Sequence, residues 1–244
     1  MNQSTETIPA FEEAVNLCIA NALEREKGEI KPGLLSESAQ KAKIASNISG
    51  SLHGFQKEFA RGYQHILNEL KEMLDNKELL SDFQPPEKNL SYFDNPVALI
   101  HFLSEGYAFY QLLGFSEKQL SKMGQAAYRL IEQNRFQDAI EAFFFLVTIA
   151  PHLGPCWYGL GYSYGKCDQD ENAIQALLRA IELSPDTSDF YLHLAHIFIK
   201  HNDFEKATSV CDLGLLAATQ DSELQATLEE AKHQINILAK GQKQ

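Results

Sequence analysis

A pattern of large and small apolar residues recurs every 34 residues through the second half of this 244-residue chain. The middle copy carries Trp157, Leu160, Gly161, Tyr164, Ala173, Leu177, Ala180 and Pro185. The copy before it carries Met123, Ala126, Ala127, Leu130, Ala139, Phe143, Leu146 and Pro151. The copy after it carries Tyr191, Leu194, Ala195, Phe198, Ala207, Cys211, Gly214 and Thr219. A unit of this length cannot bury its apolar face alone, so the period predicts a stack of similar helical units.

Small residues at two positions of each copy predict that a unit is a pair of closely packed antiparallel helices. The first position holds Ala127, Gly161 and Ala195, and the second holds Ala139, Ala173 and Ala207. Short polar segments at 133–135, 166–170 and 201–203 would form the turns between the paired helices. This spacing and composition are typical of the tetratricopeptide repeat.

The sequence therefore predicts an all-α fold in which three tetratricopeptide repeats, over residues 116–220, form a right-handed solenoid. A capping box of Ser116 and Gln119 marks the start of the first repeat helix. Residues 221–244 are predicted to form a capping helix and a tail, because a solenoid needs its last repeat covered. The apolar side of that helix would hold Leu224, Leu228, Ala231, Ile235 and Leu238.

The first part of the chain lacks the repeat. Residues 1–90 are predicted to form a helical N-terminal extension that includes a long amphipathic helix over Ser51–Leu80. Residues 91–115 are predicted to form a linking helix packed on the array, beginning near Pro96 and including Tyr110. The apolar stripes of these helices suggest the hypothesis of a homodimer through the N-terminal helices.

The net charge and hydropathy of the chain argue against several classes of function. The chain has 21 Lys and Arg against 33 Asp and Glu, a net charge of −12, which argues against nucleic-acid binding and against docking on anionic lipid. A nucleic-acid regulator would need more basic side chains than Lys41, Lys43, Lys57 and Arg61. No apolar run reaches the ~20 residues of a membrane span, and no secretory signal is recognisable at Met1–Ala10. We expect a cytoplasmic protein without membrane insertion.

Residues with catalytic or metal-binding potential do not form recognised motifs. The four cysteines, Cys18, Cys156, Cys167 and Cys211, form no Cys-x-x-Cys pair and are expected to be reduced and packed. His193, His196 and His201 lie close in sequence but lack further ligands at zinc spacing, so we expect no metal. Nucleotide-binding, serine-hydrolase and metalloprotease motifs are absent. The sequence indicates a non-enzymatic protein without a cofactor.

Several segments resemble the translocator chaperones of bacterial type III secretion, the SycD/LcrH/IpgC family. The resemblance covers roughly residues 105–240 and is carried by Leu112–Ser116, Asn134–Ala139, Trp157–Gly161, Asn172–Gln175 and Tyr191–Ala195. It implies a bacterial cytoplasmic chaperone whose concave groove holds an extended, proline-containing segment of a secreted translocator. The N-terminal region of this chain is much longer than the usual extension in that family.

The first helices of the repeats should line this groove. Counting from each repeat start, the groove-facing positions that we select are Tyr128, Ile131, Tyr158, Tyr162, Lys166, Leu192, His196 and Ile199. Tyrosines offer apolar area together with a hydroxyl that can bond an extended backbone. The resemblance implies that Tyr128, Tyr158, Tyr162, Leu192 and His196 contact the peptide. The same rings would also suit packing within the array, and the sequence leaves both interpretations open.

The leading hypothesis is thus a secretion chaperone that binds an extended segment of a hydrophobic translocator or effector and prevents its aggregation before export. The alternative is a tetratricopeptide adaptor or scaffold with no role in secretion, whose residues 1–115 bind a second, folded protein. The two differ in their partner, because only a chaperone would protect a non-native client.

Overall fold

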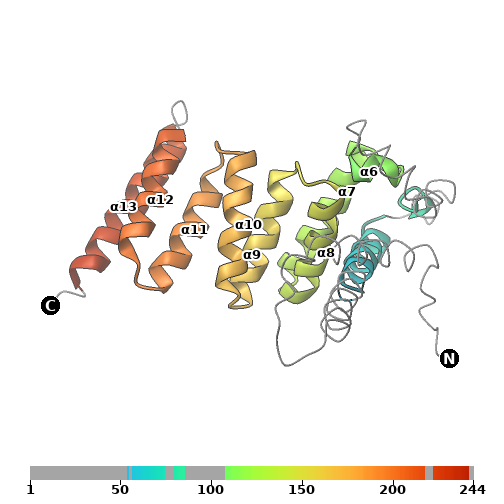
Figure 1. The fold of residues 1–244 in the computed structure, drawn as a ribbon, viewed down its shortest axis with the longest axis horizontal. Coiled ribbons are helices and arrows are strands. Elements are labelled where there is room, and N and C mark those ends of the chain that lie inside the picture. The colour runs from blue at the N-terminus through green and yellow to red at the C-terminus, as the bar shows by residue number, and fades with distance from the viewer. Residues whose placement is uncertain (1–53, 55–56, 75–79, 86–107, 218–221, 242–244) are drawn as a thin grey trace, which may run out of the picture.

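The structure is a computed structural model that describes residues 54, 57–74, 80–85, 108–217 and 222–241. The elements assigned within these ranges are helices. They are α6 (Phe109–Leu112), α7 (Glu117–Glu132), α8 (Phe136–Ile149), α9 (Gly154–Lys166), α10 (Asp170–Leu183), α11 (Ser188–Lys200), α12 (Phe204–Ala217) and α13 (Ser222–Gly241), preceded by a helix over residues 57–73. Figure 1 shows α7 to α13 side by side in one row.

The predicted repeats are the helix pairs α7/α8, α9/α10 and α11/α12. Each pair is joined by a turn whose central residue has a positive φ: Asn134 at 60°, Asp168 at 57° and Asn202 at 59°. These residues are 34 positions apart, and Asn and Asp tolerate the left-handed conformation better than most side chains. The tetratricopeptide prediction is confirmed by this repetition of backbone geometry.

Small residues lie where the paired helices approach each other. Ala139, Ala173 and Ala207 are fully buried. A Cβ atom on Gly161 would lie 2.8 Å from Leu177 and 3.1 Å from the carbonyl oxygen of Ala173, so only glycine fits the α9–α10 contact as built. The predicted role of these positions is confirmed.

The last helix, α13, covers the end of the array by packing on α11 and α12. Its Leu228 and Ile235 are buried, and Leu228 lies where a Cβ atom on Gly214 of α12 would fall. This confirms the predicted capping helix. The prediction was wrong for Leu238, which is 48% exposed because Ala239 is the residue of this turn that faces α12, and the side chain of Leu224 lies outside the described residues.

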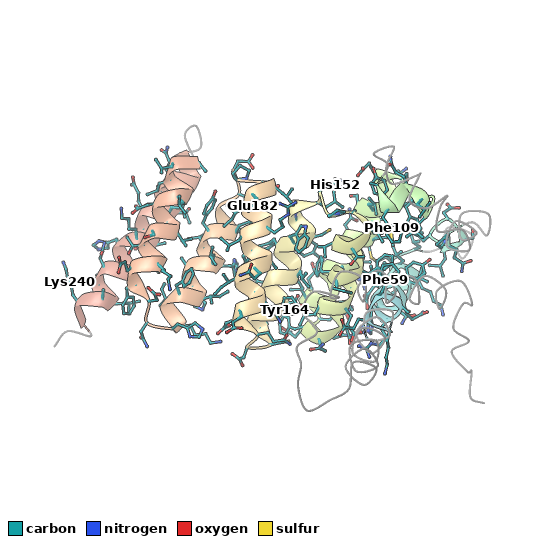
Figure 2. The ribbon with its side chains drawn as sticks, viewed as in Figure 1. Phe59, Phe109, His152, Tyr164, Glu182 and Lys240 are labelled. Atoms are coloured by element: carbon teal, nitrogen blue, oxygen red, sulfur yellow. The ribbon has the colours of Figure 1, made fainter. Side chains whose placement is uncertain are left out.

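The helix over residues 57–73 packs on the other end of the array. Phe59 and Tyr63 lie against Phe145 of α8, with ring centroids 4.7 and 5.1 Å apart, and Ile66 and Leu70 are fully buried. Figure 2 shows Phe59 and Phe109 in this region. The helix is shorter than the predicted Ser51–Leu80 span, since Leu74 leaves the helical conformation.

This packing changes the interpretation of the apolar stripe. Its described part is buried against the first repeat within the same chain and is therefore unavailable to a second copy. The homodimer through the N-terminal helices stays a prediction, and this part of the stripe does not contribute to it. Within residues 1–90 the structure describes 54, 57–74 and 80–85, and the remaining residues lie outside the described part, as does Cys18.

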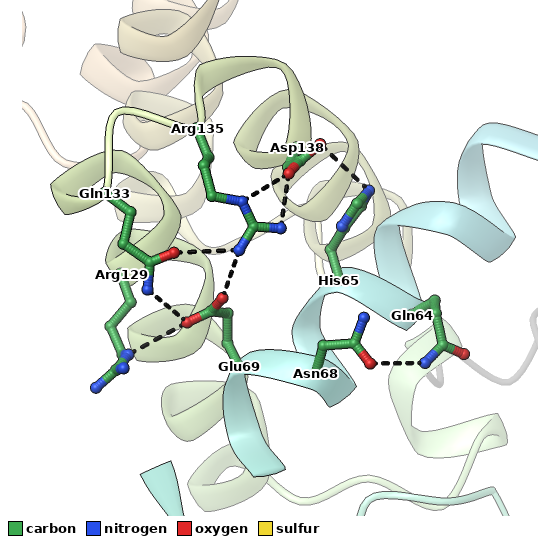
Figure 3. Close-up of polar contacts among 8 residues, drawn as sticks. All are labelled: Gln64, His65, Asn68, Glu69, Arg129, Gln133, Arg135 and Asp138. Atoms are coloured by element: carbon green, nitrogen blue, oxygen red, sulfur yellow. Dashed lines mark hydrogen bonds and ion pairs between the residues drawn. The ribbon is translucent and has the colours of Figure 1, made fainter. Parts of the chain in front are cut away.

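Two buried carboxylates join the 57–73 helix to the first repeat. Glu69, 4% exposed, accepts hydrogen bonds from Arg129, Gln133 and Arg135 at 2.8–3.3 Å (Figure 3). Glu141 of α8 forms an ion pair with Arg61 at 2.6 Å. The first contact joins this helix to the end of α7 and the turn that follows, and the second joins it to α8. Together they hold the helix over residues 57–73 in a defined register.

The helix over residues 57–73 and α8 are in close contact at Gly62. A Cβ atom there would fall 2.0 Å from the carbonyl oxygen of Glu141. The helix over residues 57–73 can therefore reach the backbone of α8 only because this residue has no side chain.

The segment before α7 differs from the predicted linking helix. Ala108 is extended, and α6 is a separate helix of four residues, so one helix does not run unbroken through Tyr110. Most of the predicted helix lies outside the described residues. Tyr110, Leu112 and Leu113 are nevertheless buried, in agreement with the expected packing on the array.

The local predictions at the start of the first repeat are confirmed. Ser116 is the N-cap of α7: its hydroxyl accepts from the backbone N–H of Gln119, and the Gln119 side chain accepts from the backbone N–H of Ser116.

The described cysteines are free thiols, and Cys156 and Cys211 are buried. Burial raises the pKa of Cys156 to about 12, so its thiol stays protonated and unreactive.

Candidate functional site

A cavity of ≈ 530 Å³ lies between α9 and α11, on the side formed by the first helices of the repeats. In tetratricopeptide arrays such helices line the concave, ligand-binding surface. The cavity, called here the α9–α11 pocket, is lined by Gly161, Tyr162, Gly165, Lys166, Asp168, Asp170, Leu177, Leu192, His193, His196, Ile197 and Lys200.

The floor of the pocket is apolar because α9 has glycines where it faces α11. Gly165 leaves space beside Ile197, whereas Gly161 lies in close contact with Leu177, which completes the floor. A Cβ atom on Gly165 would meet Ala173 at 3.9 Å and Ile197 at 4.0 Å, which are ordinary contacts. The site thus combines an apolar floor with a rim of aromatic and charged side chains.

The rim is ordered by His193. Its Nδ1 lies 2.9 Å from the carbonyl oxygen of Asp189 and 3.2 Å from the hydroxyl of Tyr158. A carbonyl only accepts hydrogen bonds, so Nδ1 is the donor to Asp189 in this geometry. The His193 ring also meets Tyr162 edge-on, with centroids 5.0 Å apart.

Two lysines at the rim differ in their partners. Lys200 donates to Asp168 at 2.7 Å and to Asp170 at 2.8 Å, and His201 contacts the same Asp170 at 2.8 Å. The hydrogen bond from Lys200 lowers the pKa of Asp170, and the bond to Asp168 raises the pKa of Lys200. Lys166 instead lies over the Tyr162 ring, with Nζ 5.2 Å from its centroid.

Half of the predicted groove residues line this pocket. They are Tyr162, Lys166, Leu192 and His196. The other four pack within the array: Ile131 and Ile199 lie against its two apolar cores, and Tyr128 and Tyr158 are held by neighbouring side chains or backbone.

Tyr128 and Tyr158 are engaged in structural contacts. Tyr128 donates its hydroxyl to the carbonyl oxygen of Pro155 at 2.6 Å, and its ring meets Phe143 edge-on at 5.0 Å. Tyr158 stacks on Phe190 with centroids 4.8 Å apart. Burial raises the pKa of both tyrosines, so both hydroxyls stay protonated.

Sequence reasoning missed several lining residues, among them Asp168, Asp170, Leu177, His193 and Ile197. Asp168 and Asp170 belong to the turn between paired helices, which the repeat pattern identifies only as polar. His193 occupies the repeat position of Gln125 and Gly159, which differs in every copy, so the repeat pattern gave no signal for it.

The structure gives no support to a metal centre at the three histidines. Within the described ranges, no three His, Cys, Asp or Glu side chains converge in a metal-binding arrangement. His193 and His196 line the pocket, whereas His201 bonds Asp170.

A second groove, of ≈ 690 Å³, lies on the opposite side between α8, α9 and α10. Trp157 lies at this groove, where its Nε1–H donates to the carbonyl oxygen of Pro151 at 2.8 Å. Tyr191 makes the equivalent bond to Pro185 at 2.8 Å in the next repeat. Trp157 therefore serves the junction between repeats.

Comparison with known proteins supports the repeat assignment. A family model described as a tetratricopeptide repeat matches residues 169–231. No curated protein matches the chain. Among the described helices, none is long and apolar enough to cross a membrane.

Similar solved structures include three complexes from different settings. A type III secretion complex from Aeromonas hydrophila is 20% identical, with a TM-score of 0.49, covering 59% of this chain and 93% of that one. The chaperone SycD of Yersinia enterocolitica, in complex with a peptide of the translocator YopD, is 18% identical, with a TM-score of 0.46 and coverages of 50% and 95%. The TPR2B domain of yeast Sti1 in an Hsp70 complex is 13% identical, with a TM-score of 0.45 and coverages of 49% and 98%.

Proposed function

We propose that this protein is a type III secretion chaperone that holds an extended segment of a hydrophobic translocator or effector in its concave groove before export. The observation that carries the proposal is the α9–α11 pocket, in which predicted groove residues from two repeats border one apolar cavity. The class of client comes from the resemblance of residues 105–240 to translocator chaperones.

The chemistry of the pocket suits an unfolded segment. An apolar floor can take a side chain that would otherwise promote aggregation, and Tyr162, His193 and His196 can bond an extended backbone at the rim. Binding of this kind acts by mass action, since it lowers the concentration of free client that can aggregate. The net charge of −12 keeps such a complex soluble.

The test is to purify the tagged full-length chain from the cells that encode it, and to identify the proteins that accompany it. The blocking variant is Gly165→Leu, whose side chain would fill the pocket floor. Gly165→Ala is the matched control, because its added methyl group makes only ordinary contacts. Far-UV circular dichroism establishes that both variants keep the fold.

A hydrophobic secreted client that accompanies the wild type and Gly165→Ala but not Gly165→Leu supports the chaperone. The purified protein should then suppress light scattering by that client. A folded partner that is retained by Gly165→Leu would contradict it and favour the adaptor alternative, with binding outside the pocket.

A further inference from the structure

The two lysines at the rim of the α9–α11 pocket differ in whether a carboxylate neutralises them, and this difference bears on the ligand. Lys200 is neutralised by Asp168 and Asp170, which lie 2.7 and 2.8 Å from its Nζ. Lys166 is exposed and has no carboxylate partner among the described residues, where its contact is the face of Tyr162. The rim therefore presents one uncompensated cation in a protein of net charge −12.

This cation is adjacent to the apolar floor. Lys166 follows Gly165 directly, and both residues line the same cavity. The cation–π contact with Tyr162 places the ammonium group over the rim. In an extended peptide, side chains two positions apart point to the same side, about 7 Å from each other. One side chain can then enter the floor while the second reaches the rim.

We propose that Lys166 and the Gly165 floor make this pocket specific for an extended segment in which an aliphatic or aromatic residue lies two positions from a carboxylate residue. The apolar side chain occupies the space above Leu177 and Ile197. The carboxylate pairs with the Lys166 ammonium. The inference rests on the proposed function of the groove and adds the ligand sequence that the groove selects.

The Asp168–Lys200–Asp170 cluster sharpens this selectivity. Its two carboxylates also line the pocket, and Lys200 holds both of them. An acidic ligand side chain placed there would meet like charge, whereas one near Lys166 meets opposite charge. The pocket thus favours one placement of the acidic residue over the other.

The probe is a fluorescein-labelled peptide with the central sequence Glu-Ser-Leu-Ser-Glu, flanked by Gly, Ser and Pro. A Glu lies two positions from the Leu on both sides, so the peptide can bind in either chain direction. Its matched partner has Gln-Ser-Leu-Ser-Gln. Fluorescence anisotropy with the full-length protein at low ionic strength gives both dissociation constants. We expect the Glu peptide to bind roughly threefold more tightly, the size typical of an exposed ion pair.

Two charge variants test the assignment to one side chain. Lys166→Gln should remove the preference for the Glu peptide, so that the two peptides bind with equal affinity. Lys118→Gln removes the same charge from an exposed position of α7 outside the pocket and should keep the preference. Gly165→Leu should weaken both peptides at least tenfold, and Gly165→Ala, which adds a single methyl group to the floor, should weaken them less.

The proposal is overturned if the wild type binds the two peptides equally, if Lys166→Gln retains the preference, or if neither peptide binds. These outcomes are separable from the fate of the chaperone proposal. Loss of client from Gly165→Leu without a Glu preference would leave the chaperone standing and remove the specificity. A Glu preference without protection of any client would support the specificity and contradict the chaperone proposal.

Discussion

Tyr128 of α7 donates its hydroxyl to the carbonyl oxygen of Pro155, at the start of α9, and so bonds the first repeat to the second. Tyr162 occupies the same position one repeat later, and the equivalent carbonyl belongs to Asp189. There His193 takes the carbonyl instead. Equivalent tyrosines therefore have different roles, one at a repeat junction and one at the pocket.

We predict that Tyr128→Phe lowers the free energy of unfolding by about 1 kcal/mol, because the hydrogen bond from Tyr128 to the carbonyl oxygen of Pro155, which joins two repeats, is lost. Peptide affinity should be unchanged, since Tyr128 does not line the pocket. Urea unfolding and anisotropy measure the two quantities. Tyr162→Phe is the control, and a stability loss as large as that of Tyr128→Phe would contradict this assignment.

Gly62→Ala should loosen the helix over residues 57–73. The added Cβ would fall 2.0 Å from the Glu141 carbonyl oxygen, and relieving the clash requires the helix to move away from α8. We expect a loss of about 1–3 kcal/mol in the free energy of unfolding, as for other overpacked sites. Limited proteolysis should then cut within residues 57–73 faster.

Gly54→Ala is the matched control for that experiment, because no atom lies within 4 Å of a Cβ at Gly54. Its unfolding and its cleavage should equal those of the wild type. Equal proteolysis of Gly62→Ala and the wild type would show that this helix does not depend on the close approach.

Glu69→Ala should destabilise the same contact by about 1–3 kcal/mol, the range for hydrogen bonds to charged groups. The loss stays below that of a fully buried ion pair, because Arg129 and Arg135 are about 40% exposed and can turn to water. Unfolding by guanidinium, read through tyrosine fluorescence, measures the change. A variant as stable as the wild type would mean that the network contributes only to the register of the helix.

Asp170→Asn should reduce stability at neutral pH by about 1 kcal/mol, through its bonds to Lys200 and His201. The pKa of Asp170 is lowered in the folded protein, chiefly by Lys200, below its ordinary value of 3.8. Its contribution is therefore present above pH 3.8 and is lost as the pH falls further. The difference between variant and wild type should shrink below that pH in thermal melts.

Asp168→Asn provides the comparison for the acid titration. Asp168 is 85% exposed, so its contact with Lys200 should contribute less than about 0.5 kcal/mol, and Asn tolerates its positive φ of 57°. A gap between Asp170→Asn and the wild type that stays constant down to pH 2 would contradict the proposed linkage.

The repeat period predicted the helix pairs because each pair is determined by local spacing. Gly161 and Ala173 lie 12 residues apart and meet within one unit, so the pattern contains their contact. The position of the 57–73 helix could not be predicted in the same way. Its apolar stripe is equally compatible with a second copy and with α8, and the contacts that decide between them, such as the close approach of Gly62 to Glu141 and the bonds of Glu69, are long-range.

The residues of the pocket were predictable only in part, because the repeat spacing gives the side of a helix that faces the groove but not the contacts that each side chain makes. Counting along a repeat gives the side of the helix that faces the groove, and Tyr162, Lys166, Leu192 and His196 do line it. The count does not reveal which side chains are already bonded to the next unit. Tyr128 and Tyr158 are engaged by Pro155 and His193, neither of which belongs to the repeat pattern.

The helices at the two ends of the array also restrict how copies of this chain can assemble. A bare end of a solenoid is complementary to the bare start of the next copy, and such head-to-tail contacts do not close but grow into filaments. Here the 57–73 helix lies on one end and α13 on the other. Neither end of the array is therefore bare, and the head-to-tail contact between repeats that would build a filament is blocked by the chain itself.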